Sequence, residues 1–495
     1  MKFLGANVAT RVERVEVKNL EGAPGGAIAL DLGAGDTDVL ALACRFMNDG
    51  ASGNHSDGVY VGGTGVRVQG CYVNGVGDTG IVAENAVGAQ ITGNTVASAT
   101  QGIGLSNFTG GEVTGNDISS TTYAGIGAEF ALPTAATQRA KRAAIVGNTI
   151  HDCTTGKGIF IYNRAQDVTV SGNPISNSPV PPALDNAIFA DDSYNLNFSG
   201  NTIANNGGYG LTILGVQGFS VVGNFIVNNS LAASGSYPGI LLAQSNATYS
   251  VTCTGGSGVE TCSYTGTGNF DFQTDDVVQN VGATGGSGTS PAGIWTITGV
   301  TATPYTNTCA NTGSVCNFTL NLPGTTSSNV TTTAAKVPNQ GMIAGNKSGS
   351  SGQATPSQNY GMYVAGGPTA IKIFPGNDFT GNLTGGILQT SNGVDSAFLS
   401  AIVSTSIVFD ASVAKTQEFT LTGSVTFTLK SYSTIAGDQI NVIICQDAAG
   451  NHTITWPSNV KGAMTIGSTA SKCSAQSFVF DGTNAYALSA GVTNL

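Results

Sequence analysis

Three carboxylates, Glu84, Glu129 and Asp191, each stand four residues after a small residue that marks a sequence repeat. Hydrolysis of a polysaccharide needs one protonated carboxylic acid for the leaving oxygen and one carboxylate as base or nucleophile. Glu129 and Asp191 are two repeats apart, about 9 to 10 Å if each repeat adds one strand of a stacked sheet. That separation is near the upper end of the roughly 6.5 to 9.5 Å range of inverting glycosidases. We therefore take Glu129 and Asp191 as the candidate catalytic pair.

Residues two places after the repeat marker form a neighbouring column that could hold a sugar ring. This column runs Tyr60, Val82, Gly104, Gly127, Phe160, Phe189, Thr212 and Leu241. Two glycines beside two phenylalanines predict a hollow next to an aromatic wall. The insertion 130–143 carries basic residues that could meet an acidic sugar, and such loops often wall a groove. The candidate substrate-binding residues are Tyr162, Phe160, Phe189, Glu84, Arg139 and Asp192.

Other interpretations of these residues stay open. Carboxylates on the outside of a repeat protein often serve only to keep it soluble, and Asp192 could merely shape a turn. A lyase would instead use Lys157, Arg164 or His151 as its base. The two tryptophans, Trp295 and Trp456, lie in alternating strands and could be sugar platforms or core residues. No compact carboxylate cluster stands out, and we expect neither a metal nor a cofactor.

The elements that must position these residues are short strands in a repeating unit. The marker recurs at 58, 80, 102, 125, 158, 187, 210, 239 and 361, with a basic step of 22 to 23 residues. A second marker, Gly-Asn, recurs in phase from Gly93-Asn94 to Gly223-Asn224, after alternating apolar residues. Alternation of period two broken by Gly and Asn turns predicts stacked coils of short strands. The fold class is therefore all-β, a right-handed parallel β-helix.

The repeat is interrupted once and then ends. We expect 1–245 to be the parallel β-helix, 246–338 an inserted β module that could bind glycans, and 339–392 the last coils. Residues 393–495 contain longer alternating strands, which we interpret as an antiparallel, sandwich-like domain for trimerisation or recognition.

Composition excludes several functions. A net charge of −11 argues against nucleic acid as the partner, because phosphate binding needs a basic stripe. No apolar run is long enough for a membrane span, and the N-terminus lacks the apolar core of a signal peptide.

Cys44 and Cys71 take the position of the repeated asparagines, which predicts a buried structural role. The four cysteines between 253 and 316 are candidates for disulfides, which would indicate an oxidising environment.

The glycine and Gly-Asn coils resemble the pectate-lyase-like superfamily of right-handed parallel β-helix proteins over most of residues 15–390. The terminal segment, with Gly437-Asp438-Gln439-Ile440, the run from Asn451 to Pro457, and Phe480-Asp481-Gly482-Thr483, looks like a module at the ends of bacteriophage tail spikes and fibres. Together these resemblances imply a homotrimeric tail-spike-like polysaccharide depolymerase, located in the virion tail or outside the cell. An N-terminal virion-attachment domain of that class is not evident. The alternatives are a non-catalytic glycan-binding fibre and a polysaccharide lyase or epimerase of the same superfamily.

Overall fold

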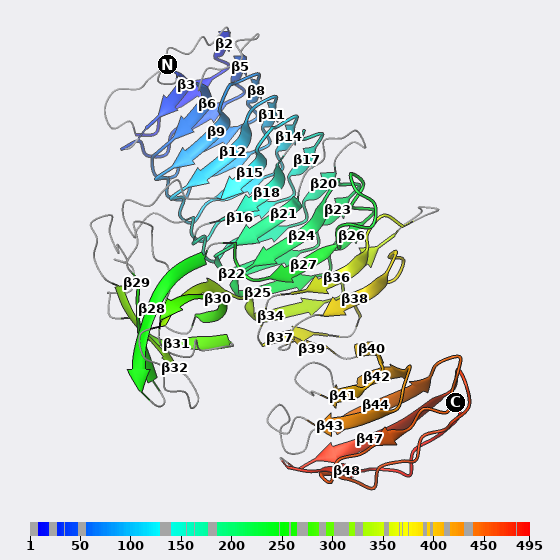
Figure 1. Ribbon diagram of the computed structural model, residues 1–495. Helices are drawn as coiled ribbons and strands as arrows, with labels where there is room; N and C mark the ends of the chain where they lie inside the picture. Colours follow the sequence, from blue (N-terminus) through cyan, green and yellow to red (C-terminus); the bar gives the residue numbers. More distant parts are fainter. Residues whose placement is uncertain are drawn as a thin grey trace. The chain divides into compact units, whose positions relative to one another are not determined.

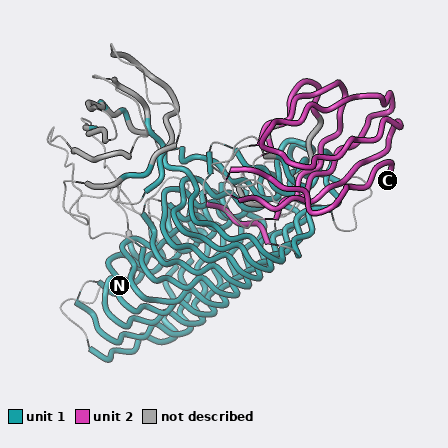
Figure 2. The backbone as a smooth tube through the Cα atoms, turned by 90° about the horizontal axis from the view of Figure 1, so that it is seen from below, with its two compact units in different colours: residues 1–369, 376–391 teal, residues 370–375, 392–495 magenta. Residues whose placement is uncertain are grey.

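The computed structural model describes residues 8–18, 27–33, 35–47, 56–128, 140–154, 156–162, 164–176, 186–246, 248–256, 259–264, 276–286, 294–300, 316–321, 330–350, 356–365, 367–368, 370–374, 376–389, 394–396, 399–409, 416–429, 439–481 and 483–495. The chain divides into two compact units, 1–369 with 376–391 and 370–375 with 392–495 (Figure 2). All the described secondary structure is β.

Three parallel sheets form the walls of a solenoid, and each coil adds one strand to each sheet (Figure 1). The first sheet has twelve strands: β1 (Arg11–Glu13), β4 (Leu40–Leu42), β7 (Arg67–Gln69), β10 (Gln90–Thr92), β13 (Glu112–Thr114), β16 (Ala144–Val146), β19 (Thr169–Ser171), β22 (Tyr194–Ser199), β25 (Gln217–Val222), β34 (Asn339–Ala344), β37 (Ile371–Ile373) and β39 (Val394–Ser396). The second has ten: β2 (Glu16–Lys18), β5 (Arg45–Met47), β8 (Tyr72–Asn74), β11 (Thr95–Ala97), β14 (Asp117–Ser119), β17 (Thr149–His151), β20 (Pro174–Ser176), β23 (Thr202–Ala204), β26 (Phe225–Val227) and β35 (Lys347–Gly349). The third has eleven: β3 (Ala27–Leu32), β6 (Ser56–Val61), β9 (Thr79–Glu84), β12 (Gln101–Ser106), β15 (Ala124–Ala128), β18 (Lys157–Ile161), β21 (Asn186–Asp191), β24 (Tyr209–Leu214), β27 (Ile240–Ala243), β36 (Tyr360–Val364) and β38 (Gly385–Gln389). The expected all-β parallel solenoid is confirmed.

The marker glycine is required by close approach of the backbone. A Cβ on Gly125 would lie 2.7 Å from the Gly158 carbonyl oxygen of the next coil and 2.7 Å from Ile150 in the core. The glycine of the Gly-Asn marker has a different role, because Gly93 adopts a φ of +62°, which favours glycine. The first marker thus requires glycine because the coils approach closely, and the second because the backbone has a positive φ.

The asparagines after these glycines form a buried ladder. Each amide donates to the side-chain oxygen of the next coil's asparagine, as from Asn116 Nδ2 to Asn148 Oδ1 at 2.8 Å. The ladder runs through Asn94, Asn116, Asn148, Asn173, Asn201, Asn224, Asn346 and Asn377. At its start, the Cys71 backbone N–H donates to Asn94, and Cys44 lies against Cys71. The structural role expected for these two buried cysteines is confirmed.

Residues between β27 and β34 leave the solenoid and return to it. They form a closed barrel of β28 (Thr248–Gly256), β29 (Val259–Tyr264), β30 (Val277–Gly286), β31 (Ile294–Val300), β32 (Cys316–Asn321) and β33 (Val330–Lys336). Strand β25 pairs directly with β34, and β27 with β36, so the coils on either side of the barrel stack in register. Cys262 in the barrel takes part in a disulfide, as expected for this segment.

The second unit holds two further sheets. One consists of β40 (Leu399–Val403), β42 (Thr416–Leu421), β44 (Gln439–Gln446), β46 (Val460–Lys461), β47 (Cys473–Phe480) and β48 (Ala485–Ala487); the other of β41 (Ser406–Phe409), β43 (Val425–Leu429) and β45 (Ile454–Thr455). Both sheets contribute to one apolar core, as in a sandwich. The expected antiparallel pairing is wrong for most of these strands, since only β44–β47 and β47–β48 among the named pairs are antiparallel.

Two residues of this unit answer questions left open by the sequence. Trp456 packs against Phe427 and Phe478, and its Nε1 donates to the Met464 carbonyl, so it belongs to the core. Cys445 and Cys473 form a disulfide between β44 and β47. The side chain of Trp295 lies outside the described residues.

Candidate functional site

The outer face of the eleven-stranded sheet brings the two predicted columns together. Gly104, Gly127, Phe160, Phe189, Thr212 and Leu241 are successive register partners from β12 to β27. Side chains alternate along each strand, so Ile159 and Ile161 are fully buried in the solenoid core while Phe160 between them lies on the outer face. The small-residue floor and the aromatic wall therefore adjoin, as expected.

The aromatic wall is a packed cluster with a cation beside it. The Phe160 ring lies 5.4 Å from Tyr162 in a stacked arrangement and 5.5 Å from Phe189. Lys157 Nζ lies 4.9 Å from the Phe160 ring centre and 5.3 Å from that of Phe189. Phe160 and Phe189 are only 6% and 8% exposed, whereas Tyr162 is half-buried. Tyr162 is thus the ring of this group that offers the most surface to a ligand.

Gln101 lies beside Gly104, in the glycine floor next to the aromatic wall. Gln101 is 8% exposed, and its Nε2 has no hydrogen-bond partner. Its Oε1 lies 3.4 Å from the position that a Cβ on Gly104 would occupy. A side chain at 104 would therefore fill the space beside this amide.

Asp191, one of the two predicted catalytic carboxylates, is not on an exposed column. It is fully buried, and Leu214, its register partner in the next coil, is 5% exposed. The expectation that the fourth-place residues face solvent is wrong here, because residues of the returning barrel strand pack on this part of the sheet: Lys336 lies over Gly215, directly after β24.

Burial changes the chemistry of the Asp191 carboxyl. Desolvation raises its pKa to about 7, and the negative charge of Asp192 acts in the same direction. Neither carboxylate oxygen has a hydrogen bond of good geometry, so the Ser245 hydroxyl and the Asn246 N–H offset the desolvation only in part. A carboxyl group of this kind is protonated near neutral pH, as a general acid must be.

Asp192 belongs to an ion cluster with Lys336 of the barrel. It adopts a φ of +47° at the turn after β21, and its Oδ1 lies 2.6 Å from Lys336 Nζ. Asp192 therefore shapes a turn and contacts the barrel, a position different from the predicted place in a sugar groove.

Glu84 ends β9, four coils from Asp191 at the end of β21 in the same sheet. The Tyr60 hydroxyl donates to Glu84 Oε2 at 3.1 Å. Burial raises the pKa of Tyr60 to about 12, and the charge of Glu84 adds to this effect. Glu84 is half-buried and remains accessible on the outer face.

Two predicted residues, Glu129 and Arg139, lie outside the described residues. Ahead of this gap, Ala128 is the register partner of Ile161, which in turn pairs with Ala190.

The three bases considered for a lyase are not brought together. His151 ends β17 in the ten-stranded sheet, and its ring nitrogens contact Asp152 at 2.8 Å and Asp117 at 3.1 Å. Partial burial lowers the pKa of His151, but these two carboxylates outweigh it and the net shift is upward. Lys157 is on the eleven-stranded sheet, and Arg164 is 4% exposed near the turn at Asp192.

The described residues contain neither a metal-binding cluster nor a helix that could span a membrane. No group of three His, Cys, Asp or Glu side chains is arranged to hold a metal ion. No helix in this part of the chain is long and apolar enough to cross a bilayer.

Two parts of the chain match known protein families. Residues 35–184 and 134–254 match the family "Right handed beta helix region". The solenoid is a right-handed parallel β-helix. Residues 405–485 match the family "Putative phage tail fibre C-terminal domain". The C-terminal part of the chain is therefore similar to the end domain of phage tail fibres. No curated protein matches the chain.

Several solved structures match parts of the chain at low sequence identity. A tailspike double mutant of the E. coli bacteriophage HK620 is 14% identical over 67% of this chain and 65% of its own, with a TM-score of 0.32. The Dettilon tailspike protein is 13% identical over 68% of this chain and 87% of its own, with a TM-score of 0.30. The A-module of the Azotobacter vinelandii mannuronan C-5 epimerase AlgE4 is 10% identical over 78% of this chain and 90% of its own, with a TM-score of 0.42.

Proposed function

We propose that this chain is a tail-spike-like protein that binds a bacterial surface polysaccharide along the outer face of the eleven-stranded sheet. The observation that carries the proposal is the aromatic group Phe160, Tyr162 and Phe189, with Lys157 beside it, next to the glycine floor. Aromatic faces stack on sugar rings, and small residues allow a ring to approach the backbone. The tail fibre domain match supports a virion location, where a host-surface glycan is the natural ligand.

We further propose that the bound glycan is hydrolysed, with Asp191 as general acid and Glu129 as base. The support is chemical: Asp191 has a pKa of about 7, which leaves it protonated for transfer to the leaving oxygen. The sequence repeat puts Glu129 two coils from Asp191, and that separation would suit an inverting mechanism with a water between the carboxyl groups.

A second function, glycan binding without turnover, is favoured by one specific observation. Asp191 has no exposed surface, and the returning barrel strand packs over the neighbouring part of the sheet. A general acid must reach the glycosidic oxygen, so burial of this degree suits a structural carboxyl better than a catalytic one.

Incubation with a panel of capsular and O-antigen polysaccharides separates these functions. A hydrolase releases fragments that have gained water, a lyase releases fragments that absorb as unsaturated uronates, and a binder releases none. With a cleaved substrate, Glu129→Gln and Asp191→Asn should each abolish turnover but retain binding. Glu84→Gln is the matched control in the same column and should retain activity. Equal activity in all three variants would refute the assigned pair.

Trimeric assembly is part of the same proposal. Residues 393–495 would provide the trimer contacts, and the barrel within 246–338 would add a glycan-binding surface. Light scattering should then give about three times 49.7 kDa. A monomer at micromolar concentration would refute the assembly and leave glycan binding to be judged separately.

A further inference from the structure

A buried lysine lies where the barrel returns to the solenoid. Lys336 ends β33, and its side chain is 1% exposed. Around it are Asp192 from the turn after β21, Tyr194 from β22 and Asp276 directly before β30 of the barrel. The side chains of the two aspartates are 4% and 3% exposed. Burying ions in this way costs several kcal/mol each unless geometry and hydrogen bonding are excellent.

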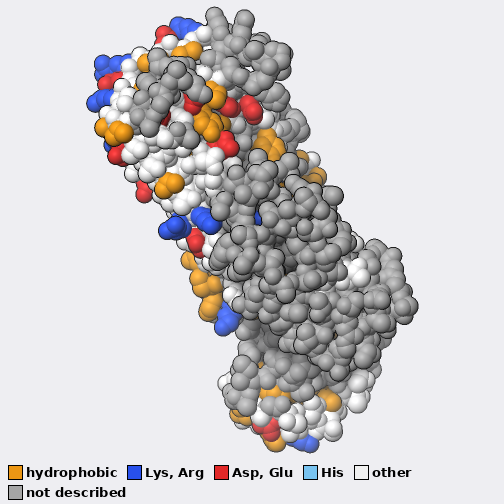
Figure 3. Space-filling view, turned by 90° about the vertical axis from the view of Figure 1, so that its left-hand side faces the viewer, with side chains coloured by type: hydrophobic (Ala, Val, Ile, Leu, Met, Phe, Trp, Pro, Cys, Tyr) orange, Lys and Arg blue, Asp and Glu red, His pale blue; other side chains and the backbone are white. Residues whose placement is uncertain are grey.

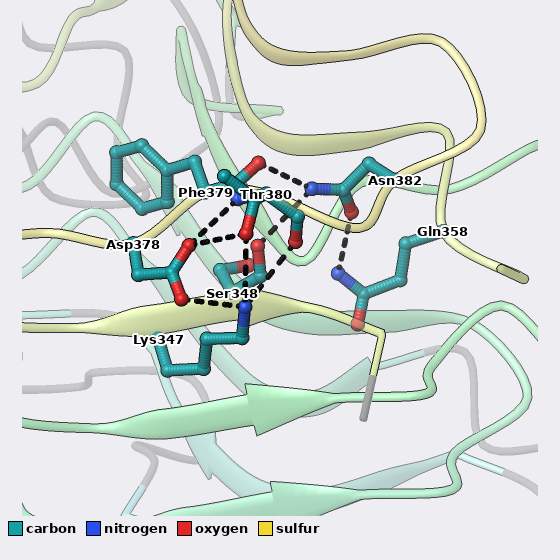
Figure 4. A network of polar contacts seen from close by, with 7 residues as sticks. All are labelled: Lys347, Ser348, Gln358, Asp378, Phe379, Thr380 and Asn382. Atoms are coloured by element: carbon teal, nitrogen blue, oxygen red, sulfur yellow. Dashed lines mark hydrogen bonds and ion pairs between the residues drawn. The ribbon is translucent and has the colours of Figure 1, made fainter. Parts of the chain in front are cut away.

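The closest contact of the cluster brings the amine against one carboxyl group. Lys336 Nζ is 2.6 Å from Asp192 Oδ1, which puts the nitrogen beside the carboxyl carbon. The pair of Lys347 and Asp378 in the last coils offers a comparison (Figure 4). There Nζ donates a hydrogen bond to Oδ2 at 2.7 Å, but the Asp378 side chain is 50% exposed, so water can hydrate that pair. The buried pair has almost no contact with water.

A route for protons leads away from the same nitrogen. Lys336 Nζ donates to the Tyr194 hydroxyl at 2.6 Å, and that hydroxyl donates to Asp276 Oδ2 at 3.1 Å. Asp276 Oδ2 is itself 3.5 Å from Nζ. The site thus combines a nucleophile, a carboxyl carbon, and a third group that can accept and return a proton.

We propose that Lys336 and Asp192 become joined by an intramolecular isopeptide bond, with Asp276 as the proton shuttle. The ammonium passes one proton to the Asp192 carboxylate, which leaves a neutral amine and a neutral acid. Nζ then adds to Cγ of Asp192 and forms the N–C bond. Asp276 takes a proton from the nitrogen through Tyr194 and returns it to a hydroxyl on Cγ. The C–O bond breaks, water leaves, and an amide remains.

Burial favours the product over the reactants. The ion pair loses its hydration inside the protein, whereas a neutral amide needs only a donor and an acceptor for its two polar groups. The reaction requires no oxidant or other co-reactant, because amide formation releases only water.

The bond would fasten the barrel to the solenoid. It would close the chain between residues 192 and 336, a segment that contains every barrel strand. A covalent cross-link of a long loop restricts the unfolded chain and resists local opening. The end of the barrel at Lys336 would then stay attached to the turn after β21 under mechanical load.

Intact mass spectrometry of the full chain after disulfide reduction tests the proposal. We expect a mass lower than that of the sequence by one water molecule, and a proteolytic fragment in which the peptide of Lys336 is linked to that of Asp192. A mass equal to that of the linear sequence would overturn the proposal and leave the cluster as an ion pair.

Variants identify the reacting atoms. Lys336→Arg and Asp192→Ala should each have the full linear mass. Asp192→Asn should still react, but with loss of ammonia in place of water, so its final mass should equal that of the bonded parent. Asp276→Asn should remain largely unreacted while keeping the parent's circular dichroism. Lys347→Arg is the matched control and should still lose one water; linkage at Lys347 instead of Lys336 would contradict the assignment.

Discussion

Replacing Asp191 by asparagine should change the stability of the protein in a way that depends on pH. Burial raises the pKa of this carboxyl from 3.8 to about 7 in the folded protein. Because the folded state holds the proton more tightly, the group is most favourable to folding at low pH. Its contribution is lost as pH rises from about 4 through about 7 and is constant above that.

The size of the effect follows from the pKa values. At 1.36 kcal/mol for each tenfold change, a rise from 3.8 to about 7 corresponds to about 4 kcal/mol between acid and neutral pH. Asparagine has a similar shape and carries no charge, so the variant does not lose this stability as pH rises. It adds a buried amide donor, which costs about 1–3 kcal/mol when unsatisfied. The variant should therefore be less stable than the parent near pH 4 and about 1–3 kcal/mol more stable at pH 8.

Urea unfolding of both proteins at several pH values between 4 and 8 measures this difference. The diagnostic quantity is the difference in free energy of unfolding between variant and parent, which should rise with pH and level off above about 7. Glu84→Gln, at a half-buried site on the same face, should show a much smaller dependence. A difference for Asp191→Asn that stays constant from pH 4 to 8 would refute the raised pKa and its cause.

Three further outcomes are expected. Tyr162→Ala should weaken binding of a recognised polysaccharide about tenfold in calorimetry, through loss of a stacking surface, while Tyr72→Ala on the ten-stranded sheet should not. Asn148→Ala should cost about 2–5 kcal/mol in urea unfolding, because it leaves the Asn116 amide and backbone N–H without their acceptor; a loss below about 1 kcal/mol would contradict the ladder's role. Asp378→Asn should lower the free energy of unfolding by less than about 1 kcal/mol, because the pair with Lys347 is exposed. This loss should vanish as pH falls from about 4 through about 2, because Lys347 lowers the pKa of Asp378 to about 2.

The sequence was informative wherever the determining contacts repeat from coil to coil. Gly125 and Asn148 each meet the equivalent residue of the next coil, so the same steric and hydrogen-bonding demand recurs at every step. The same repetition allowed the columns of Gly127, Phe160 and Phe189 to be aligned by counting. Register in a solenoid is a local property, which is why it could be predicted.

Contacts that do not repeat could not be predicted in this way. Asp191 is fully buried, and its neighbours include Ser245 and Asn246, which follow β27 where the chain leaves the solenoid. The parallel pairing of β42 with β44 was missed because side chains alternate identically in parallel and antiparallel strands. The signal for Lys336 was a lone lysine at the end of a Thr- and Ala-rich segment in a chain with few charges.

The junction at Lys336 bears on both the proposed activity and the proposed cross-link. Asp191 and Asp192 are adjacent but contact different parts of the molecule. Asp191 is the register partner of Leu214 in the eleven-stranded sheet, whereas Asp192 contacts Lys336 of the barrel. At this junction the Ser245 hydroxyl lowers the pKa of Asp191 and so offsets part of the rise that desolvation causes. If Asp191 is the general acid, Ser245→Ala should raise that pKa further and move the alkaline limb of the pH–rate profile to higher pH; a limb that stays in place would contradict this role of Ser245.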